Sequence, residues 1–590
     1  AVLPLLLREA PRLGPFDLAF VGGLAAVLLW VLASALWSSS PGRSILESQR
    51  ALVYVAGVAA LLLLGRSPRY RSVITALWAA VALAAAYALT TKLLPGTFEG
   101  FDSIAGYRLS DPIGYWNALG AFCALGILLA IGLATHSGST AVRALAAGSL
   151  PLLLVTLYFT FSRGAWLGLG AGGLALVVFE SRRLRVAAVG LPLSVPAGLA
   201  LAAAYRSEAL TERGASLERA IGAGRDLGYL VLLATSASLL IGLGLTWAER
   251  RIEPPARLRL WFAALLLVVI LGAGGFGLVR VGGPVEFIES TSDGFRAPPI
   301  PVPVGESANQ RLFSLSNSGR IIQWRVAREQ FAQRRLVGTG AGTHELYWVA
   351  NRPIAAKVRD AHSLYLETLA ELGIVGMGLL GFALAVPVAA AFVARRRPLV
   401  PAALAAYVVY LAHATVDWDW ELPAVTLAAL FCGGSIVLAA RGEVAALSTR
   451  ARAAGVAAAL VVSAFALVGL IGSSALEEGW NALERGETAG ALDEAEVAER
   501  WSPWASEPLR LAAAAASLDE DDAAAHVYLR QAAERDPDDW NVWFDLAQVS
   551  EGAEARSALG RALRLNPLGP ELAQYLEANG IRRANLPGAP

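Results

Sequence analysis

Apolar runs of about twenty residues recur along most of the chain, and this pattern constrains the fold more than any other feature. A helix of roughly 20 residues crosses a hydrocarbon core of ~30 Å, whereas the strands of an outer-membrane barrel would give shorter segments of alternating polarity. The composition agrees, since 56% of the 590 residues are hydrophobic and only 16% are charged. The sequence therefore predicts an all-α, polytopic membrane protein with about 12–14 transmembrane helices. The expected spans are residues 16–37, 51–64, 73–94, 115–135, 142–161, 165–179, 186–205, 227–247, 260–278, 364–393, 402–415, 422–440 and 454–471.

The arginines between these runs predict how the helices are oriented. With a cytoplasmic N-terminus, most arginines of residues 1–475 outside the large loop fall in cytoplasmic loops, as the positive-inside rule requires. The extracytoplasmic side then receives Arg108, Arg163, a large loop at residues 281–361 and the turn at residues 417–421. The segment after the last span emerges on the same side. The polar clusters of interest are therefore expected on the outer face of the cytoplasmic membrane.

The composition changes after residue 475. From Glu477 onward, 22 acidic residues stand against 10 arginines, a net charge of −12, whereas the whole chain carries +1. Pro503, Pro537 and Pro567 recur at spacings of 34 and 30 residues, with Ala-rich amphipathic segments between them. This pattern predicts a soluble, tetratricopeptide-like helical repeat domain at residues 476–590, following a membrane domain at residues 1–475. Such a domain either binds a protein partner or is a short helical stack without a ligand.

Two short motifs carry polar residues that turn geometry does not explain. In the loop before the expected span 115–135, the prolines and glycines are ordinary punctuation, but Arg108 and Asn117 place polar atoms at the outer mouth of the bundle. In Ser162-Arg163-Gly164, the serine is a suitable N-cap. Arg163, close to the hydrocarbon, must snorkel, form an ion pair or bind an anion such as phosphate, which suits its planar fork of donors.

The large loop contains a second arginine-rich segment. The spacing of Arg320 and Trp324 places both side chains on one face of a helix. Arg325 and Arg328 fit the same helix, either as substrate contacts or as the polar face of a helix lying on the membrane surface. The run from Gly338 to Gly342 is not a nucleotide loop, because it lacks the lysine and the strand-to-helix context of one.

His362 is the best candidate for proton transfer, because only histidine titrates near neutral pH without perturbation. The chain contains just five histidines. His413, with Asp417 and two further acidic residues of the same turn, resembles a set of metal ligands. Tryptophans and a proline in that turn fit an ordinary interfacial turn equally well, so we expect no metal there.

Several motifs occur together and in one order. They are Asn117 in the early loop, Ser162-Arg163-Gly164-Ala165-Trp166, Ser318-Gly319-Arg320 with Trp324, the glycine run 338–342, His362-Ser363 with Tyr365-Leu366-Glu367, Glu371-Leu372-Gly373, and the turn from His413 to Asp417. Together they resemble the O-antigen ligase and O-antigen polymerase family, the WaaL and Wzy types of bacterial envelope glycan assembly. The resemblance spans roughly residues 16–440. A tryptophan precedes Asn117 where the family often has proline, and the double-Asn form of the motif is absent.

The resemblance implies a GT-C-like membrane glycosyltransferase that uses no nucleotide sugar, metal or other cofactor. The donor would be a glycan on undecaprenyl pyrophosphate, and the acceptor a hydroxyl of a glycan, a lipid-linked glycan or a protein. Arg163 and Arg320 would stabilise the leaving pyrophosphate, and His362 would activate the acceptor hydroxyl, giving inversion. The substrate-binding residues implied are Arg108, Asn117, Trp324, Arg325, Tyr365, His413 and Asp417.

Three further functions compete with a glycan ligase or polymerase. A protein O-oligosaccharyltransferase would share the same chemistry. A polysaccharide transporter or flippase would bind the same phosphates without catalysis, and would tolerate loss of His362. A scaffold that acts through its repeat domain would tolerate loss of Arg320. No feature of the sequence points to nucleic acid.

Overall fold

The structure of the protein is a computed structural model that describes residues 11–65, 69–97, 108–249, 307–313, 319–444 and 446–588, together with residues 257, 261, 264 and 293. Within these ranges the chain is helical and contains no β-strand. The expected span at residues 260–278, apart from residues 261 and 264, lies outside the described residues, as do Ser318 and much of the large loop.

The predicted all-α, polytopic membrane fold is confirmed. Ten described helices are long and apolar enough to cross a membrane, two more are apolar but shorter, and each of the twelve coincides with an expected span. The ten are α2 (Pro15–Ser34), α3 (Pro41–Leu64), α4 (Tyr70–Leu93), α5 (Trp116–His136), α6 (Thr140–Phe159), α8 (Arg183–Arg206), α10 (Leu217–Glu249), α16 (Leu364–Ala394), α18 (Pro423–Ala440) and α19 (Thr449–Glu484). The two shorter ones are α7 (Arg163–Phe179) and α17 (Val400–His413).

The chain divides into two compact units, each assembled from separate stretches of sequence. The first unit contains Ala1–Leu64, Ile322–Leu384 and Val444–Pro590, and the second contains Gly65–Ile321 and Ala385–Glu443. The predicted division at residues 475 and 476 is a different partition, and it stays a prediction.

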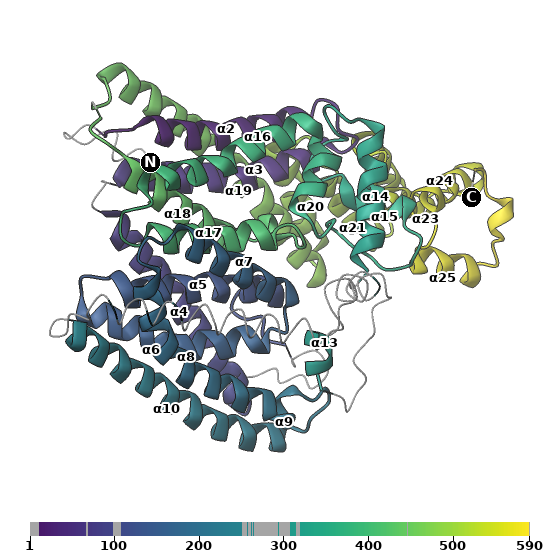
Figure 1. The fold of residues 1–590 in the computed structure, drawn as a ribbon. Coiled ribbons are helices and arrows are strands. Elements are labelled where there is room, and N and C mark those ends of the chain that lie inside the picture. Colours follow the sequence, from purple (N-terminus) through teal and green to yellow (C-terminus); the bar gives the residue numbers. More distant parts are fainter. Residues whose placement is uncertain are drawn as a thin grey trace. The chain divides into compact units, whose positions relative to one another are not determined.

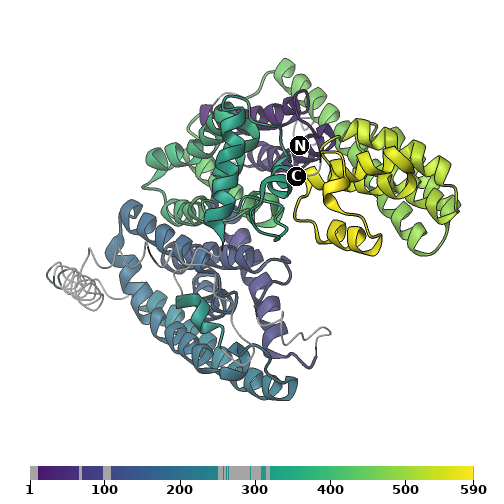
Figure 2. The same ribbon diagram turned by 90° about the vertical axis from the view of Figure 1, so that its right-hand side faces the viewer.

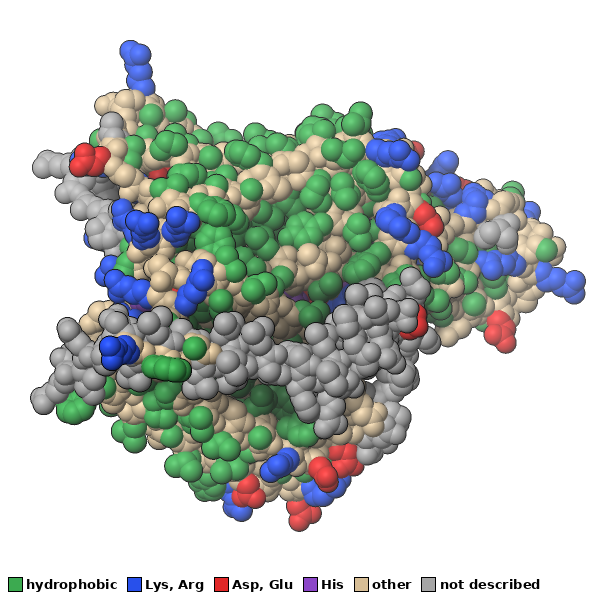
Figure 3. All heavy atoms as spheres, in the orientation of Figure 1, with side chains coloured by type: hydrophobic (Ala, Val, Ile, Leu, Met, Phe, Trp, Pro, Cys, Tyr) green, Lys and Arg blue, Asp and Glu red, His purple; other side chains and the backbone are tan. Residues whose placement is uncertain are grey.

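In the second unit, α5 is the central helix and packs against α4, α6, α7 and α17 (Figure 1). Nearly all of its length is buried, because its apolar side chains meet other helices on every side. The outer helices α8 and α10 instead leave large apolar side chains exposed, among them Leu199 and Leu233. Hydrophobic side chains cover much of the visible surface in Figure 3, as expected for helices that face lipid.

The contact between α7 and α17 depends on small residues at intervals of four. A Cβ atom at Gly168 would lie 3.1 Å from the carbonyl oxygen of Val409, and one at Gly172 would lie 2.6 Å from that of Ala405. Small residues at this spacing let two membrane helices approach backbone to backbone. One turn earlier in α7, Gly164 packs against the side chain of His413.

The first unit contains α2, α3, the first part of α16, α19, and two short helices of the large loop, α14 (Arg320–Gln333, from its third residue on) and α15 (His344–Asn351). Helix α16 is broken at Gly373, whose φ of 68° is left-handed. The segment before the glycine-rich loop fills the break, since Ile374 N–H donates to Arg335 and Gly340 N–H donates to Glu371 at 2.9 Å each. Within the glycine run, Gly338 packs against the backbone of α16, whereas Gly340 packs against Ser38.

The C-terminal segment forms six helices, of which the first five pack one against the next (Figure 2, yellow-green to yellow). They are α20 (Thr488–Trp501), α21 (Glu507–Leu518), α22 (Asp522–Arg535), α23 (Trp540–Val549), α24 (Gly552–Leu565) and α25 (Pro570–Ala578). The apolar faces of α21 to α25 join Trp348 of α15 and Val326 of α14 in one hydrophobic core, whereas α20 packs in a separate cluster with α19 and α21. The repeat segment is thus built into the first unit, and its likeness to tetratricopeptide repeats stays a prediction.

Candidate functional site

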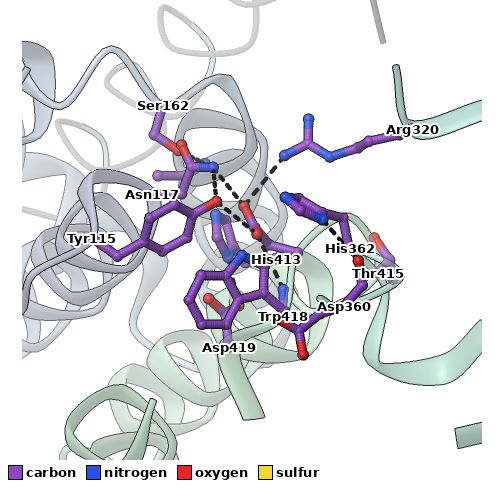
Figure 4. Close-up of polar contacts among 12 residues, drawn as sticks. Tyr115, Asn117, Ser162, Arg320, Asp360, His362, His413, Thr415, Trp418 and Asp419 are labelled. Atoms are coloured by element: carbon purple, nitrogen blue, oxygen red, sulfur yellow. Dashed lines mark hydrogen bonds and ion pairs between the residues drawn. The ribbon is translucent and has the colours of Figure 1, made fainter. Parts of the chain in front are cut away.

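The most connected polar group of the second unit is the buried carboxylate of Asp417, in the turn after α17. Asn117 Nδ2 donates to its Oδ2 at 2.6 Å and Tyr115 Oη donates to its Oδ1 at 3.0 Å. Arg320 Nη2 lies 3.3 Å from the same Oδ2. Asp417 is only 1% exposed, so these donors replace water around its charge (Figure 4). The predicted residues Asn117, Arg320 and Asp417 thus come together around one carboxylate.

Arg108 binds the amide oxygen of Asn117, whose amide nitrogen donates to Asp417. Its Nη2 donates to Asn117 Oδ1 at 3.0 Å and its Nε to the Thr160 carbonyl at 2.9 Å. Its guanidinium carbon lies 4.3 Å from the centre of the Trp116 ring. Oδ1 of Asn117 is therefore turned to Arg108, and Nδ2 to Asp417. Arg108, predicted to bind substrate, is buried and placed to orient Asn117.

Three arginines of the second unit act on one another electrostatically. Arg163 is the first residue of α7, whose N-cap is Ser162 as predicted, with the Ser162 hydroxyl accepting from the Ala165 N–H at 3.3 Å. The pKa of Arg163 is lowered to about 10, by burial first and then by the positive charges of Arg311 and Arg320. Like charges held together in this way favour an anionic ligand.

Arg311, in the short helix α13 (Asn309–Phe313), was not singled out from the sequence, because it lies in the large loop without a motif around it. The Nε–H groups of Arg311 and Arg320 are buried and have no hydrogen-bond partner among the described residues. Buried donors of this kind are costly unless something accepts from them.

His413 is fully buried, and its Nδ1 lies 2.5 Å from Asp419 Oδ2 in the short helix η2 (Asp419–Glu421). A Cβ atom at Gly164 would lie 3.0 Å from His413 Nε2. The structure therefore accounts for the glycine of the Ser162-Arg163-Gly164 motif. His413, predicted to bind substrate, joins α7 to the Asp417 turn.

In the first unit, His362 lies just before α16 in a left-handed conformation, with φ 50°. This conformation is uncommon for a residue with a side chain, and neighbouring bonds hold it in place. Trp324 Nε1 donates to the His362 carbonyl at 3.4 Å, and the Ala361 N–H donates to Glu367 at 2.8 Å. The predicted pair Trp324 and His362 is thus brought into contact.

The ring of His362 is oriented by its own loop. Its Nδ1 lies 3.1 Å from the backbone oxygen of Asp360, and a carbonyl oxygen only accepts. Nδ1 therefore carries the hydrogen in the neutral ring, and Nε2 is the basic nitrogen. Burial also raises the pKa of Asp360 to about 6, against the opposing effect of Arg359.

The other predicted residues lie near this loop in the sequence. Tyr365 is half-buried in the first turn of α16, and Arg325 is exposed on α14. Arg320 and Trp324 occupy the first and second turns of α14, as their spacing predicts. Glu371 caps α15 by accepting from the N–H groups of Gly342 and His344 at 2.9 and 2.8 Å.

The comparisons with known proteins agree with the family that the motifs indicate. Residues 219–381 match the family model Wzy_C, described as O-antigen ligase. This range includes α14, α15 and the loop that carries His362. No curated protein matches the chain. With its membrane helices, the match indicates a membrane glycosyltransferase of the ligase or polymerase type. For this part of the chain, the match supports the O-antigen ligase and polymerase family that the motifs predict.

Proposed function

We propose that the protein transfers an oligosaccharide from undecaprenyl pyrophosphate to an acceptor hydroxyl, with inversion and without a metal. The observation that carries the proposal is the group formed by Arg163, Arg311 and Arg320. Burial and then the charges of Arg311 and Arg320 lower the pKa of Arg163, and the Nε–H groups of Arg311 and Arg320 are buried without an acceptor among the described residues. A diphosphate would supply negative charge to this group and acceptor oxygens to the two Nε–H groups.

The negative charge that these arginines stabilise grows as the glycosidic bond breaks. As the bond between the anomeric carbon and the pyrophosphate oxygen breaks, the bonding electron pair leaves with the pyrophosphate. Guanidinium groups already in place stabilise that growing charge without reorganisation. Asp417 supports this role because its carboxylate lies 3.3 Å from Arg320 Nη2 and is itself held by Asn117 and Tyr115.

The acceptor hydroxyl is activated by His362 in this mechanism. The hydroxyl oxygen attacks the anomeric carbon from the face opposite the pyrophosphate, and its proton passes to His362 Nε2. The Nδ1 contact with the Asp360 carbonyl supports this assignment, because it fixes the tautomer that a general base requires. Trp324 and Tyr365 would contact the sugar rings, and Arg325 the phosphate or the membrane surface.

The reaction is assigned to the extracytoplasmic face of the cytoplasmic membrane. The support is the distribution of arginines, including Arg395, Arg396 and Arg397 between α16 and α17 and Arg441 after α18, which mark cytoplasmic loops by the positive-inside rule. On that threading the repeat segment lies outside the cytoplasm. A protein O-oligosaccharyltransferase, with a protein hydroxyl as acceptor, is the nearest alternative.

A transfer assay with purified full-length protein tests the proposal. The reaction contains a lipid-pyrophosphate oligosaccharide, glycan and protein acceptors, and EDTA. We expect wild type to release glycan from the lipid, and His362→Ala and Arg320→Ala to lower the rate by about 10²-fold or more. Arg328→Ala is the matched control, because Arg328 is exposed on the same helix as Arg320.

The outcomes separate the alternatives. Product length distinguishes a polymerase from a ligase, and the acceptor that is used distinguishes both from protein glycosylation. The protein would instead be a transporter if it bound the substrate without transfer to any acceptor and if His362→Ala kept full function in cells. Equal losses in Arg320→Ala and Arg328→Ala would remove the special role given to Arg320.

A further inference from the structure

The first unit contains a hollow lined by residues other than those proposed for transfer chemistry. Its volume is about 280 Å³, and four parts of the chain line it. Trp37 comes from the loop after α2, Tyr347 and Asn351 come from α15, and Gln333 and Arg334 come from the end of α14 and the following turn. The repeat segment adds residues from two of its proline junctions, of which Asp538 is polar.

The lining combines aromatic rings with planar polar groups. The indole N–H of Trp37 is buried and has no hydrogen-bond partner among the described residues. Arg334 Nη1 fixes the Trp37 backbone by donating to its carbonyl at 3.0 Å. Asn351 uses one amide hydrogen for the Tyr347 carbonyl at 2.9 Å, which leaves its side-chain oxygen as an acceptor. The lining thus combines aromatic rings with amide groups.

This chemistry favours an uncharged, polyhydroxylated ligand. Among the lining residues the charges of Arg334 and Asp538 oppose each other, so the pocket lacks the basic excess that a phosphate would need. Its amides and hydroxyls would stay unsatisfied around a lipid chain. A sugar ring, in contrast, places its C–H face on an aromatic ring and its hydroxyls on amide and carboxylate groups.

We propose that this pocket is a saccharide subsite that holds the acceptor glycan. The inference rests on the proposed function for the identity of the glycan as a substrate. It also gives the repeat segment a task, because its proline junctions complete the pocket wall through Asp538 and Leu565. The subsite contributes affinity for the acceptor and not bond cleavage.

Binding is tested first, without any donor. Labelled full-length protein is applied to an array of bacterial surface oligosaccharides that carry no lipid, and the tightest oligosaccharide is titrated by calorimetry. We expect Trp37→Ala and Asn351→Ala each to weaken this binding by about tenfold. Trp37→Phe keeps a ring but removes the N–H, and should fall between wild type and Trp37→Ala. Trp480→Ala, which removes a partly exposed tryptophan of α19, is the control and should bind as wild type does.

Transfer kinetics then separate this inference from the proposed function. In a wild type that transfers glycan, Asn351→Ala should raise the KM for the acceptor and leave kcat and the donor KM unchanged. Unchanged binding and unchanged acceptor KM in both Trp37→Phe and Asn351→Ala would overturn the subsite while transfer stands. Binding that depends on Trp37, in a protein that transfers nothing to any acceptor, would support the subsite and refute the transferase. A wild type that binds no oligosaccharide on the array and has no acceptor KM sensitive to these residues refutes the subsite.

Discussion

Arg352 Nη2 donates a hydrogen bond of 2.8 Å to Asn566 Oδ1, although the two residues are 214 positions apart in the chain. Arg352 follows α15, and its Nη1 also donates to the carbonyls of Ala355 and Ala356 at 3.1 Å each. Asn566 lies at the last proline junction of the repeat segment and is fully buried. The repeat segment is therefore hydrogen-bonded to the loop that leads from α15 to His362.

Replacing Asn566 with alanine should disturb this connection. Loss of the acceptor leaves Arg352 Nη2 buried without a partner, at a cost of about 1–3 kcal/mol. We expect a lower melting temperature and a slower transfer reaction, measured by intrinsic fluorescence and by the glycan-release assay. Asn579→Ala is the control, since Asn579 is exposed at the end of α25 and bonds only within its own helix end. Equal effects of the two substitutions would show that the connection does not matter.

Asp417→Asn should impair transfer more than it impairs folding. The amide keeps the shape of the side chain but removes the negative charge beside Arg320. The Nδ2 of Asn117 then meets a neutral amide in place of a carboxylate. We expect a loss of about 10-fold to 10²-fold in kcat/KM for the lipid-linked donor. Asp111→Asn, an exposed position of the same early loop, should react normally. A normal donor reaction in Asp417→Asn would mean that Arg320 needs no carboxylate to hold it.

Asp536 should make the stability of the first unit depend on pH. Burial raises its pKa from 3.8 to about 7, with Asp539 and Glu507 adding to the shift and the bond from Ser40 and the charge of Arg43 opposing it. Since the folded pKa exceeds the unfolded one, the folded state is favoured at low pH and loses stability as pH rises from about 4 to about 7. The loss is on the order of 1–4 kcal/mol.

Asp536→Asn checks this prediction. The amide cannot ionise, so the variant should melt at a higher temperature than wild type above pH 7 and at a similar temperature near pH 4. Thermal unfolding followed by intrinsic fluorescence over this range gives the comparison. Parallel pH curves for wild type and variant would rule out Asp536 as the source. Asp522→Asn, at an exposed position at the start of α22, should leave the curve unchanged.

Gly338→Ala should prevent the loop from docking on α16. A Cβ atom there would lie 2.2 Å from the backbone of Glu371, and the residue has a left-handed φ of 71°. The clash and the strained backbone together should cost several kcal/mol, on the order of 3 or more. We expect low yields of folded protein by size-exclusion chromatography. Gly381→Ala, in α16 with no atom within 4 Å of the new methyl, should be neutral or mildly stabilising. Normal folding of Gly338→Ala would contradict the docking.

The sequence predicts the membrane helices well because their signal is local. An apolar run of sufficient length has few alternatives in a bilayer, so each expected span that falls in the described residues coincides with a helix. The capping role of Ser162 and the shared helix of Arg320 and Trp324 are local as well. These features need only neighbouring residues to be correct.

The contacts of the candidate site depend on residues far apart in the chain, and this is why the sequence predicts them less well. The sequence around Arg108 does not indicate that its guanidinium donates to Asn117 and to the Thr160 carbonyl. Arg311 belongs to no motif. His413 resembles a ligand by its residue type, but its partner is Asp419, and Gly164 packs against its ring. Residue type predicts the chemistry of a side chain, and only the fold determines which partner uses it.

The break in α16 has a consequence for chain length. The segment before and within the glycine run bonds to both sides of the break, through Arg335 and Leu336 on one side and Thr339 and Gly340 on the other. Inserting or deleting one residue between Leu336 and Thr339 would shift the register of these bonds and leave backbone groups of α16 unpaired. Loops ordinarily accept such changes. Here the number of residues is set as strictly as in a β-hairpin, although the described chain contains no strand.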